Sequence, residues 1–442
     1  MTNDQRLTTN YNTRRISMKV LVVGGGGREH TLVWKLKQSS HVDKIYCAPG
    51  NGGIARDAEC VPLAAENLDG LADFAQEQKI DLTVVGPEAP LTAGIVDLFK
   101  SRGLKVFGPD AKAACLEGSK VFAKEKMTRY GVPTAAYRVF YDATAALKFV
   151  RELNSPCVVK ADGLAAGKGV IIAKNRAEAE QAVRLIMEER AFGDAGKSVV
   201  VEQLLQGEEV SVLAFTDGKT IKTLAASQDH KRIFDGDEGP NTGGMGAYSP
   251  PPVYTSDLHE KAVKDVLEPV IHGLADDGIK YKGVIYAGLM VTSEGPYVLE
   301  FNCRFGDPET QVVVPRLKSD LLEVMNAVIE ERLDEVELEW DPRAAVCVVA
   351  ASGGYPGAYE KGKVITGLDE LPPDILVFHA GTALSDGKLV TSGGRVLGIT
   401  GFGATIEDAV KRVYSGMERI HFQGIHYRRD IAHRALKKGV VK

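Results

Sequence analysis

The chain has 442 residues and a formal net charge of −5, and 44% of its residues are hydrophobic. At about 100–200 residues per domain, this length predicts roughly two to four domains, and the weakly negative charge gives no electrostatic footprint for nucleic acid. The six cysteines are scattered without a C-x-x-C pair, which argues against a zinc site or a disulfide framework and fits a reducing cytoplasm.

Residues 1–17 are polar and lack the apolar core of a secretory signal, although they carry Arg6, Arg14 and Arg15. We expect a disordered extension, or a stretch that results from an upstream start codon. Asp4 and the short length disfavour a transit peptide. Because no apolar run reaches the roughly 18 residues of a membrane span, no membrane partner is expected.

An N-terminal domain is expected over residues 18–119. Strands are predicted at residues 18–23, 44–48, 81–85 and 105–107, and helices at residues 30–38, 68–78 and 93–102. Strands that alternate with helices form βαβ units, so the pattern predicts a parallel sheet with right-handed crossovers.

Gly24–Gly27 follow the first predicted strand and precede a helix, a place where free N–H groups bind anions. The run differs from a dinucleotide fingerprint because Glu29 or His30 occupies the third glycine position. The second strand also ends at Ala48-Pro49-Gly50-Asn51 without a ribose-binding acid. A phosphosugar is therefore favoured over NAD in this crevice, which residues 86–91 should also face.

A second domain is expected over residues 120–340, with a lid at about residues 137–206. Helices are predicted at residues 120–130, 143–153, 257–275 and 315–331, and strands at residues 137–140, 157–161, 170–173, 198–204, 209–215 and 221–226. Residues 341–442 are expected to form a small α/β domain whose final helix lies near residues 406–420. The fold class predicted for the whole chain is α/β.

The loop at residues 162–169 is rich in glycine and alanine, so its backbone N–H groups can approach a polyphosphate closely. Lys160, at the preceding strand end, is suited to contact the phosphates; the alternative for this loop is an ordinary flexible hairpin. Lys124 is interpreted either as a second phosphate or adenine contact or as a solvated helix lysine. Residues 199–209 are predicted to form the end of a strand followed by an acidic turn, which is suited to bind adenosine. An ordinary strand and turn would show the same pattern.

Residues 227–248 predict one long loop, and long structured loops in compact domains are often functional. In this loop Asp229 is suited to bind an ammonium group, and Lys231 or Arg232 is suited to bind an anion. His230 is expected to be a structural or solvent-facing histidine, because nothing nearby in the sequence orients it.

The pattern at residues 288–302 predicts a hairpin that ends in a metal site. Side chains alternate along a strand, so Glu300 and Asn302 should project from one face. Carboxylate and amide oxygens suit Mg²⁺ or Mn²⁺, although a surface hairpin would carry the same residues. Arg304 comes next on that face if the strand extends so far, where it could hold a carboxylate or phosphate. Cys303 should face the core.

Eleven motifs in this order resemble those of the ATP-grasp enzymes, and within them the phosphoribosylamine–glycine ligase family. They are GGREH, APGN, GPEAPL, LEGSK, KADGLAAGKGV, FGDAG, SQDHKR, GPNTGGMGAYSP, EFNCRFGDPETQ, GGYPG and GGRVL. The resemblance runs over essentially all of residues 18–442. The resemblance implies an N-terminal Rossmann-like domain, a lid subdomain, a central ATP-grasp domain and a small C-terminal α/β domain. It also implies ATP-dependent ligation of glycine to 5-phosphoribosylamine through glycyl phosphate, giving glycinamide ribonucleotide, ADP and phosphate in de novo purine biosynthesis.

The resemblance also assigns roles to residues. ATP would be held by Lys124, Lys160, Gly163, Gly167, Lys168, Gly169, Glu202, Leu205 and Glu209. The metal ion, Mg²⁺ or Mn²⁺, would be held by Glu300 and Asn302. Glycine would be held by Asp229 and Arg304, which with Lys160 form the expected catalytic set. Phosphoribosylamine would be held by Gly26, Gly27, Glu29, Asn51, Pro87 and Glu88. A cytoplasmic monomer is expected.

Two positions depart from the family pattern. Gly25 stands where many members have asparagine, and residues 285–290 offer no metal carboxylate on the strand before Glu300. Three rival interpretations remain: another ATP-grasp ligase or carboxylase, a nicotinamide-dependent oxidoreductase, and a non-catalytic nucleotide-binding module.

Overall fold

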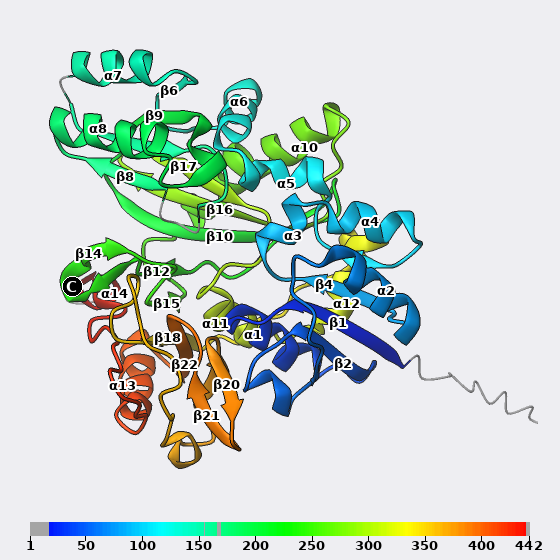
Figure 1. The fold of residues 1–442 in the computed structure, drawn as a ribbon. Helices are drawn as coiled ribbons and strands as arrows, with labels where there is room; N and C mark the ends of the chain where they lie inside the picture. Colours follow the sequence, from blue (N-terminus) through cyan, green and yellow to red (C-terminus); the bar gives the residue numbers. More distant parts are fainter. Residues whose placement is uncertain (1–16, 154, 166–168, 439–442) are drawn as a thin grey trace, which may run out of the picture.

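The computed structural model describes residues 17–153, 155–165 and 169–438. The predicted disorder of residues 1–17 falls, apart from Ser17, outside the described residues. Figure 1 shows three regions: the N-terminal sheet in blue, the lid at the top, and the C-terminal sheet in orange and red. The mixed content of helices and strands confirms the predicted α/β class.

The N-terminal sheet has the strand order β3-β2-β1-β4-β5, and all its pairs are parallel, as predicted. Its strands are β1 (Met18–Gly24), β2 (Val42–Pro49), β3 (Glu59–Cys60), β4 (Leu82–Val85) and β5 (Val106–Phe107). The helices are α1 (Gly27–Leu36), α2 (Leu68–Gln78), α3 (Glu88–Thr92), α4 (Ile95–Ser101) and α5 (Ala111–Gly118).

The helices of this region differ from the prediction in several places: α4 covers Ile95–Ser101 rather than residues 93–102, and α3 was not predicted. Helix α1 begins at Gly27 rather than His30, because the Glu29 carboxylate accepts the Gly26 N–H at 2.6 Å and closes the first turn. Helix α5 was not predicted; Asp110 caps it by accepting the Ala113 N–H at 3.0 Å.

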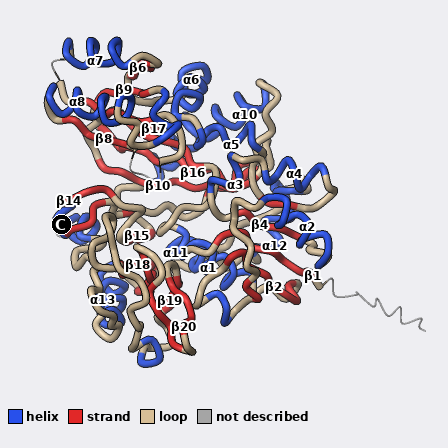
Figure 2. The backbone as a smooth tube through the Cα atoms, in the orientation of Figure 1, coloured by secondary structure: helices blue, strands red, loops and turns tan. Residues whose placement is uncertain are grey.

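The lid is a separate antiparallel sheet with its own hydrophobic core. Its order is β6 (Tyr137–Phe140), β9 (Val199–Gln203), β7 (Cys157–Ala161) and β8 (Val170–Ala173). Helices α7 (Ala143–Glu152) and α8 (Arg176–Val183) pack on this sheet, and α6 (Lys120–Tyr130) precedes it. Figures 1 and 2 show the lid above the sheet that contains β10, β16 and β17.

This central sheet is also antiparallel and has the order β11-β10-β16-β17. Its strands are β10 (Glu208–Thr216), β11 (Ile221–Thr223), β16 (Gly283–Thr292) and β17 (Gly295–Asn302). The register of β16 and β17 passes from Gly288 opposite Glu300 to Leu289 opposite Val298, so Leu299 is an additional, bulged residue. The predicted helix at 257–275 is α9 (Ser256–Lys261) and α10 (Glu268–Asp276), joined by a π-helical stretch.

The predicted long loop at 227–248 instead contains four short strands: β12 (Gln228–Asp229), β13 (Arg232–Phe234), β14 (Glu238–Asn241) and β15 (Gly246–Ser249). Strand β15 pairs with β18 (Ala344–Ala351), so this segment joins the C-terminal sheet β12-β15-β18-β22-β19. The remaining elements are β19 (Leu376–His379), β20 (Thr382–Ser385), β21 (Lys388–Thr391), β22 (Arg395–Gly403), α13 (Ile406–Met417) and α14 (His433–Lys438). The predicted final helix is thus α13, and α14 follows it.

The helix predicted at residues 315–331 begins at the wrong residue. Helix α11 (Thr310–Val313) and a short 3₁₀ turn (Val314–Arg316) come first, and α12 covers Leu321–Ile329. The intervening residues bond elsewhere: the Lys318 N–H donates to the Glu339 carbonyl at 2.8 Å. Asp320 then starts α12 by accepting the Leu322 N–H at 2.9 Å.

Among the described residues no helix is both long and apolar enough to span a membrane. The six cysteines, all within the described part, are unpaired. Cys303 is 1% exposed, which confirms that it faces the core.

Asp320→Ala should lower the free energy of unfolding of the unit containing α12 by about 1–2 kcal/mol. The reason is that the Leu322 N–H loses its cap and the Ser39 hydroxyl loses its acceptor at 2.6 Å. Asp320→Asn keeps a side-chain oxygen and should lose less. Urea unfolding followed by circular dichroism measures both; an unchanged midpoint for Asp320→Ala would contradict the capping role.

Candidate active site

The predicted metal pair lies where β17 ends. Glu300 and Asn302 are half-buried and stand opposite Gly288 and Tyr286 in the β16 register. The strand stops at Asn302, so the condition under which Arg304 would share its face is not met. Arg304 nevertheless donates to Asn302 Oδ1 at 3.2 Å. An amide oxygen has a second lone pair, so this oxygen and the Glu300 carboxylate together fit a hard divalent cation.

Two predicted ATP lysines share one buried carboxylate. Glu202 is 3% exposed; its Oε2 lies 3.1 Å from Lys124 Nζ and its Oε1 lies 3.0 Å from Lys160 Nζ. Lys160 Nζ also donates to the carbonyl of the bulged Leu299 at 3.0 Å, which joins the lid to the metal strand. Burial lowers the pKa of Lys124 to about 8, although Glu202 opposes that shift. The triad therefore fixes where the ammonium groups of the two lysines lie.

Lys120 is a cation that the sequence reasoning missed, although it belongs to the quoted LEGSK motif. Its Nζ donates to the Gly163 carbonyl at 2.9 Å. Burial lowers the pKa of Lys120, while attraction from the nearby Glu300 carboxylate raises it. Gly163 adopts a φ of +131°, a left-handed conformation open mainly to glycine. Of the other predicted loop residues, Gly169 accepts the Ala161 N–H at 2.8 Å, whereas Gly167 and Lys168 lie outside the described residues.

The predicted adenosine residues lie where the chain passes from β9 to β10. Leu205 is half-buried in this turn. The Glu209 carboxylate forms an ion pair with Lys231, and this attraction lowers the pKa of Glu209. Lys231 therefore links the adenosine turn to the segment that carries Asp229.

Asp229 is 7% exposed. Burial raises its pKa to about 7; Lys231 opposes the shift, and the carboxylates of Glu309 and Glu209 add to it. Glu309, which the sequence reasoning did not single out, accepts a hydrogen bond from the Tyr286 hydroxyl at 2.8 Å. An acidic pocket with a raised carboxyl pKa is suited to receive a cation, because a cation would restore the ionised form.

Arg304 connects the metal strand to the N-terminal helices. Its Nε lies 3.2 Å from a Glu88 oxygen and its Nη2 lies 2.8 Å from a Glu117 oxygen. Burial alone would raise the pKa of Glu88, but Arg304 and Arg28 outweigh it and lower the pKa to about 2. Burial raises the pKa of Glu117 despite Arg304. Glu117 was missed as well; the LEGSK motif was its signal.

A cavity of about 370 Å³ opens between the N-terminal and C-terminal regions. It is lined by Gly25, Gly26, Gly50, Asn51, Asp307, Tyr355, Ala380, Gly381, Thr382, Ser392 and Arg395. Of the predicted phosphoribosylamine residues, Gly26 and Asn51 line it, whereas Gly27, Glu29, Pro87 and Glu88 do not. Arg395, from the GGRVL motif, is the strongest candidate missed; its guanidinium lies 3.1 Å from Asp307 Oδ2.

Glu29 and Asn51 shape this cavity rather than offering free groups to it. The Glu29 carboxylate accepts the Gly26 N–H and the Arg28 Nε–H, both at 2.6 Å. The Asn51 amide donates to the Gly25 and His379 carbonyls at 2.9 and 2.8 Å, which ties the two regions together.

Gly25, the first departure from the family pattern, has a packing reason here. A Cβ at this position would lie 2.5 Å from the Gly50 carbonyl oxygen. A side chain would therefore require the two glycine loops to separate.

A lid sheet over a central antiparallel sheet, with two buried lysines that share one carboxylate, resembles the arrangement of ATP-grasp enzymes, and the fold places the chain in that class. The biotin carboxylase domain of 2-oxoglutarate carboxylase from Hydrogenobacter thermophilus shares this fold, with a TM-score of 0.73 at 18% identity over 93% of this chain and 91% of that chain. Models of phosphoribosylglycinamide synthetase match residues 18–117 (N domain), 118–310 (ATP-grasp domain) and 345–434 (C domain). The chain belongs to the phosphoribosylglycinamide synthetase family of ATP-dependent ligases.

Relatives cover nearly the whole chain. A phosphoribosylamine–glycine ligase of Pseudomonas aeruginosa is 53% identical over 425 residues, 95% of this chain and 99% of that protein. The ligase of Caldanaerobacter subterraneus is 52% identical over 415 residues, 94% of this chain and 99% of that protein. The crystal structure of the Thermotoga maritima ligase superposes with a TM-score of 0.80 at 37% identity, over 94% of this chain and all of that chain. The predicted family is confirmed.

The raised pKa of Asp229 predicts a pH-dependent stability. A folded-state pKa near 7, against about 3.8 when unfolded, means that the folded state holds this proton more tightly. The resulting stabilisation is complete below about pH 4 and is lost as the pH rises to about 7. The Asp229→Asn side chain cannot titrate. Across that pH range, the free energy of unfolding of the wild type should therefore fall by on the order of 2–4 kcal/mol relative to this variant. Denaturant unfolding of both proteins from pH 4 to 8 measures the difference; parallel profiles would refute the shift.

Proposed function

We propose that this protein joins glycine to 5-phosphoribosylamine with ATP, forming glycinamide ribonucleotide, ADP and phosphate in purine biosynthesis. The observation that carries the proposal is the Arg304 network, which connects the metal pair on β17 to the helices beside the N-terminal crevice. Such a network supports the proposal, because it would hold the proposed phosphoryl-transfer site next to the proposed phosphosugar site. The family of the chain and its phosphoribosylamine–glycine ligase relatives support the same reaction.

A carboxylate does not react directly with an amine, so its oxygen must first be activated as a leaving group. A glycine carboxylate oxygen attacks the γ-phosphorus of ATP, and ADP leaves, which gives glycyl phosphate. The amine of phosphoribosylamine then attacks the acyl carbon, phosphate leaves, and the nitrogen loses a proton. No side-chain nucleophile is needed, and the protein acts by positioning and charge neutralisation.

For ATP, Lys160 and the described part of the 162–169 loop are proposed to contact the phosphates. Lys120 is proposed to join them, because the Glu300 carboxylate lies near enough to attract it. Lys124 and Lys160 both pair with Glu202, and Lys124 also donates to the Thr134 hydroxyl at 2.7 Å. Glu300 and Asn302 would hold Mg²⁺ or Mn²⁺, which neutralises phosphate charge when bound.

For glycine, the ammonium group is proposed to bind at Asp229, within the acidic pocket completed by Glu309. The carboxylate would then lie toward Arg304, whose guanidinium already touches Asn302. This orientation places the reacting oxygen beside the metal pair.

For phosphoribosylamine, the phosphate is proposed to enter the cavity between the N-terminal and C-terminal regions. Arg395 supplies a cation there, and the N-terminus of α1 supplies a favourable dipole. The amine would extend toward Glu88 and Arg304.

Acyl phosphates hydrolyse, so water must be excluded. The unit at residues 137–206 is proposed to close over ATP as a lid, with hinges near residues 134–136 and 206–207. The separate hydrophobic core of this unit supports movement as a body.

The direct test is ADP release with Mg²⁺, glycine and phosphoribosylamine generated in situ, with each component omitted in turn and the product identified by mass. Turnover that requires every component and yields glycinamide ribonucleotide supports the proposal. ADP release that is independent of glycine, or a product of another mass, would overturn it.

Glu300→Ala should lower kcat by about 10²–10³-fold, because a metal oxygen ligand that acts in phosphoryl transfer is lost. The Kd for ATP should change far less. Glu294→Ala is the matched control, since Glu294 lies in the turn of the same hairpin and is exposed. Steady-state kinetics and ATP titration calorimetry give both quantities; near-normal turnover of Glu300→Ala would remove this residue from the site.

Quaternary structure and location complete the proposal. We propose a cytoplasmic monomer; the six unpaired cysteines of the described part fit a reducing compartment. Light scattering of the purified protein tests the monomer.

A further inference from the structure

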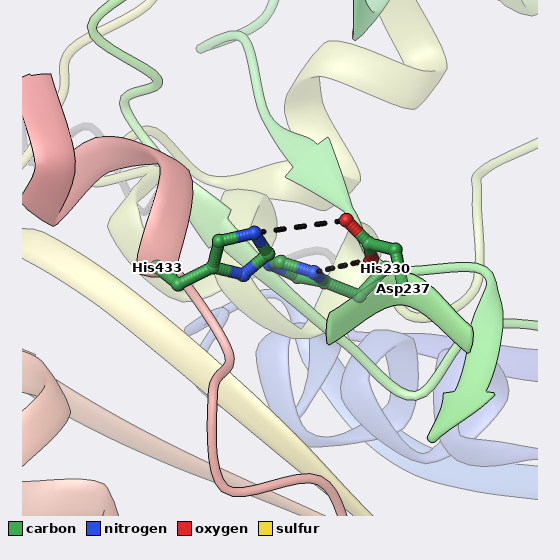
Figure 3. A group of neighbouring side chains, drawn as sticks. All are labelled: His230, Asp237 and His433. Carbon is green, nitrogen blue, oxygen red and sulfur yellow. Dashed lines mark ion pairs between the residues drawn. The ribbon is translucent and has the colours of Figure 1, made fainter. Parts of the chain in front are cut away.

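His230, Asp237 and His433 form a compact cluster between the 228–241 segment and the last helix (Figure 3). Their potential ligand atoms all lie within 4.8 Å of one another, an arrangement that could hold a metal ion. Asp237 lies 3.6 Å from a ring nitrogen of each histidine. The contacts around the cluster argue against a bound metal ion.

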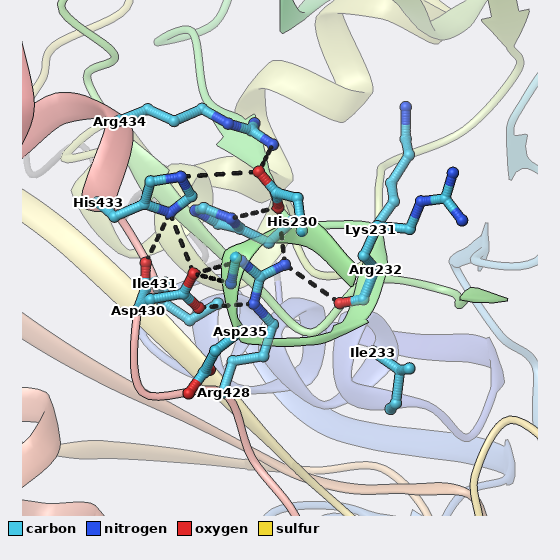
Figure 4. Close-up of polar contacts among 12 residues, drawn as sticks. His230, Lys231, Arg232, Ile233, Asp235, Arg428, Asp430, Ile431, His433 and Arg434 are labelled. Carbon is cyan, nitrogen blue, oxygen red and sulfur yellow. Dashed lines mark hydrogen bonds and ion pairs between the residues drawn. The ribbon is translucent and has the colours of Figure 1, made fainter. Parts of the chain in front are cut away.

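The backbone N–H of Ala432 donates to His230 Nε2 at 3.0 Å. A neutral imidazole that accepts at Nε2 carries its proton on Nδ1, so the nitrogen that faces Asp237 is not a free ligand. Asp237 is also paired with two cations, Arg428 at 2.9 Å and Arg434 at 2.7 Å (Figure 4). A metal ion would have to displace both guanidinium groups.

The cluster instead lies directly behind the proposed glycine pocket. Neighbouring side chains of an extended chain point to opposite sides. Asp229 lies close enough to Lys231, Glu309 and Glu209 to feel their charges, and Lys231 forms an ion pair with Glu209. The His230 ring, in contrast, is fully buried between Tyr248 and His433, with ring centroids 6.0 and 5.2 Å away. Burial lowers the pKa of His230 to about 4, which keeps the ring neutral at physiological pH.

The last helix reaches the same segment through a second residue. Arg434 Nη2 binds Asp237 at 2.7 Å, and its Nη1 donates to the backbone carbonyl of Asp229 at 3.4 Å. Residues near the C-terminus thus contact the Asp229–Lys231 segment in two ways. Ala432 binds the His230 side chain, and Arg434 binds the backbone carbonyl of Asp229.

We propose that His230 and Arg434 are positioning residues for the glycine ammonium site: contacts with residues 428–434 fix the orientation of the Asp229 carboxylate. Neither residue touches the substrate. The inference rests on the proposed function, since it assigns the ammonium group of glycine to Asp229.

The test is steady-state kinetics with glycine varied at saturating ATP and phosphoribosylamine, then with ATP varied. His230→Leu leaves the Ala432 N–H without an acceptor in a buried site, so the KM for glycine should rise about ten-fold while the KM for ATP stays within about two-fold. His230→Gln offers an oxygen near the position of Nε2 and should restore most of the affinity for glycine. Arg434→Gln should raise the KM for glycine in the same selective way.

Arg412→Gln is the matched control, because Arg412 is a half-exposed arginine on α13 whose ion pair with Asp374 lies outside this cluster. It should leave both KM values unchanged. If His230→Leu does not fold, Arg434→Gln provides the test through the same selectivity.

A fall in kcat and melting temperature without a selective change in the glycine KM would show a merely structural role and overturn the inference. His230→Gln behaving as badly as His230→Leu would overturn the role of the acceptor. A wild-type enzyme that releases no ADP with glycine would overturn the proposed function and this inference together, so the two failures are distinguishable.

Discussion

The buried guanidinium of Arg304 is the interaction on which the site depends. Its side chain is 15% exposed and binds Glu88, Glu117 and Asn302, which come from α3, α5 and β17. Removing one partner of a buried ion pair lowers the free energy of unfolding by about 3–5 kcal/mol, because the remaining charge stays desolvated. The three elements are therefore held in one arrangement, and the metal pair keeps a fixed distance from the N-terminal crevice.

Buried charges held by opposite charges also occur on the lid side of the site. Glu202 neutralises Lys124 and Lys160, and Lys160 also binds the carbonyl of the bulged Leu299. Without this carboxylate, two ammonium groups in one low-dielectric space would repel each other. Preorganised charges of this kind cost little reorganisation when a polyphosphate arrives. The bulge in β17 thereby couples the position of the lid sheet to the metal strand.

Local patterns sufficed for much of the fold. The helices at 68–78 and 120–130 were predicted to the residue, because caps and turn residues lie within a few positions of each end. The helix at 315–331 was wrong because residues near 318 bond to residues near 339, a contact absent from any local window. Likewise, β15 in the predicted 227–248 loop pairs with the distant β18, whereas β13 and β14 pair with each other inside the segment.

By itself, the sequence determined which candidate groups the site could contain. The predicted oxygen ligands Glu300 and Asn302, the glycines of the 162–169 loop and Lys160 follow from residue type and short-range alternation, which are local properties. The tertiary structure decided which groups remain free to act. It paired Lys124 and Lys160 with the Glu202 carboxylate, brought Lys120 near enough to Glu300 for attraction, and brought Arg395 to the cavity across a contact of distant segments. Burial and partners set the charge and availability of a side chain, and both depend on residues far away in the chain.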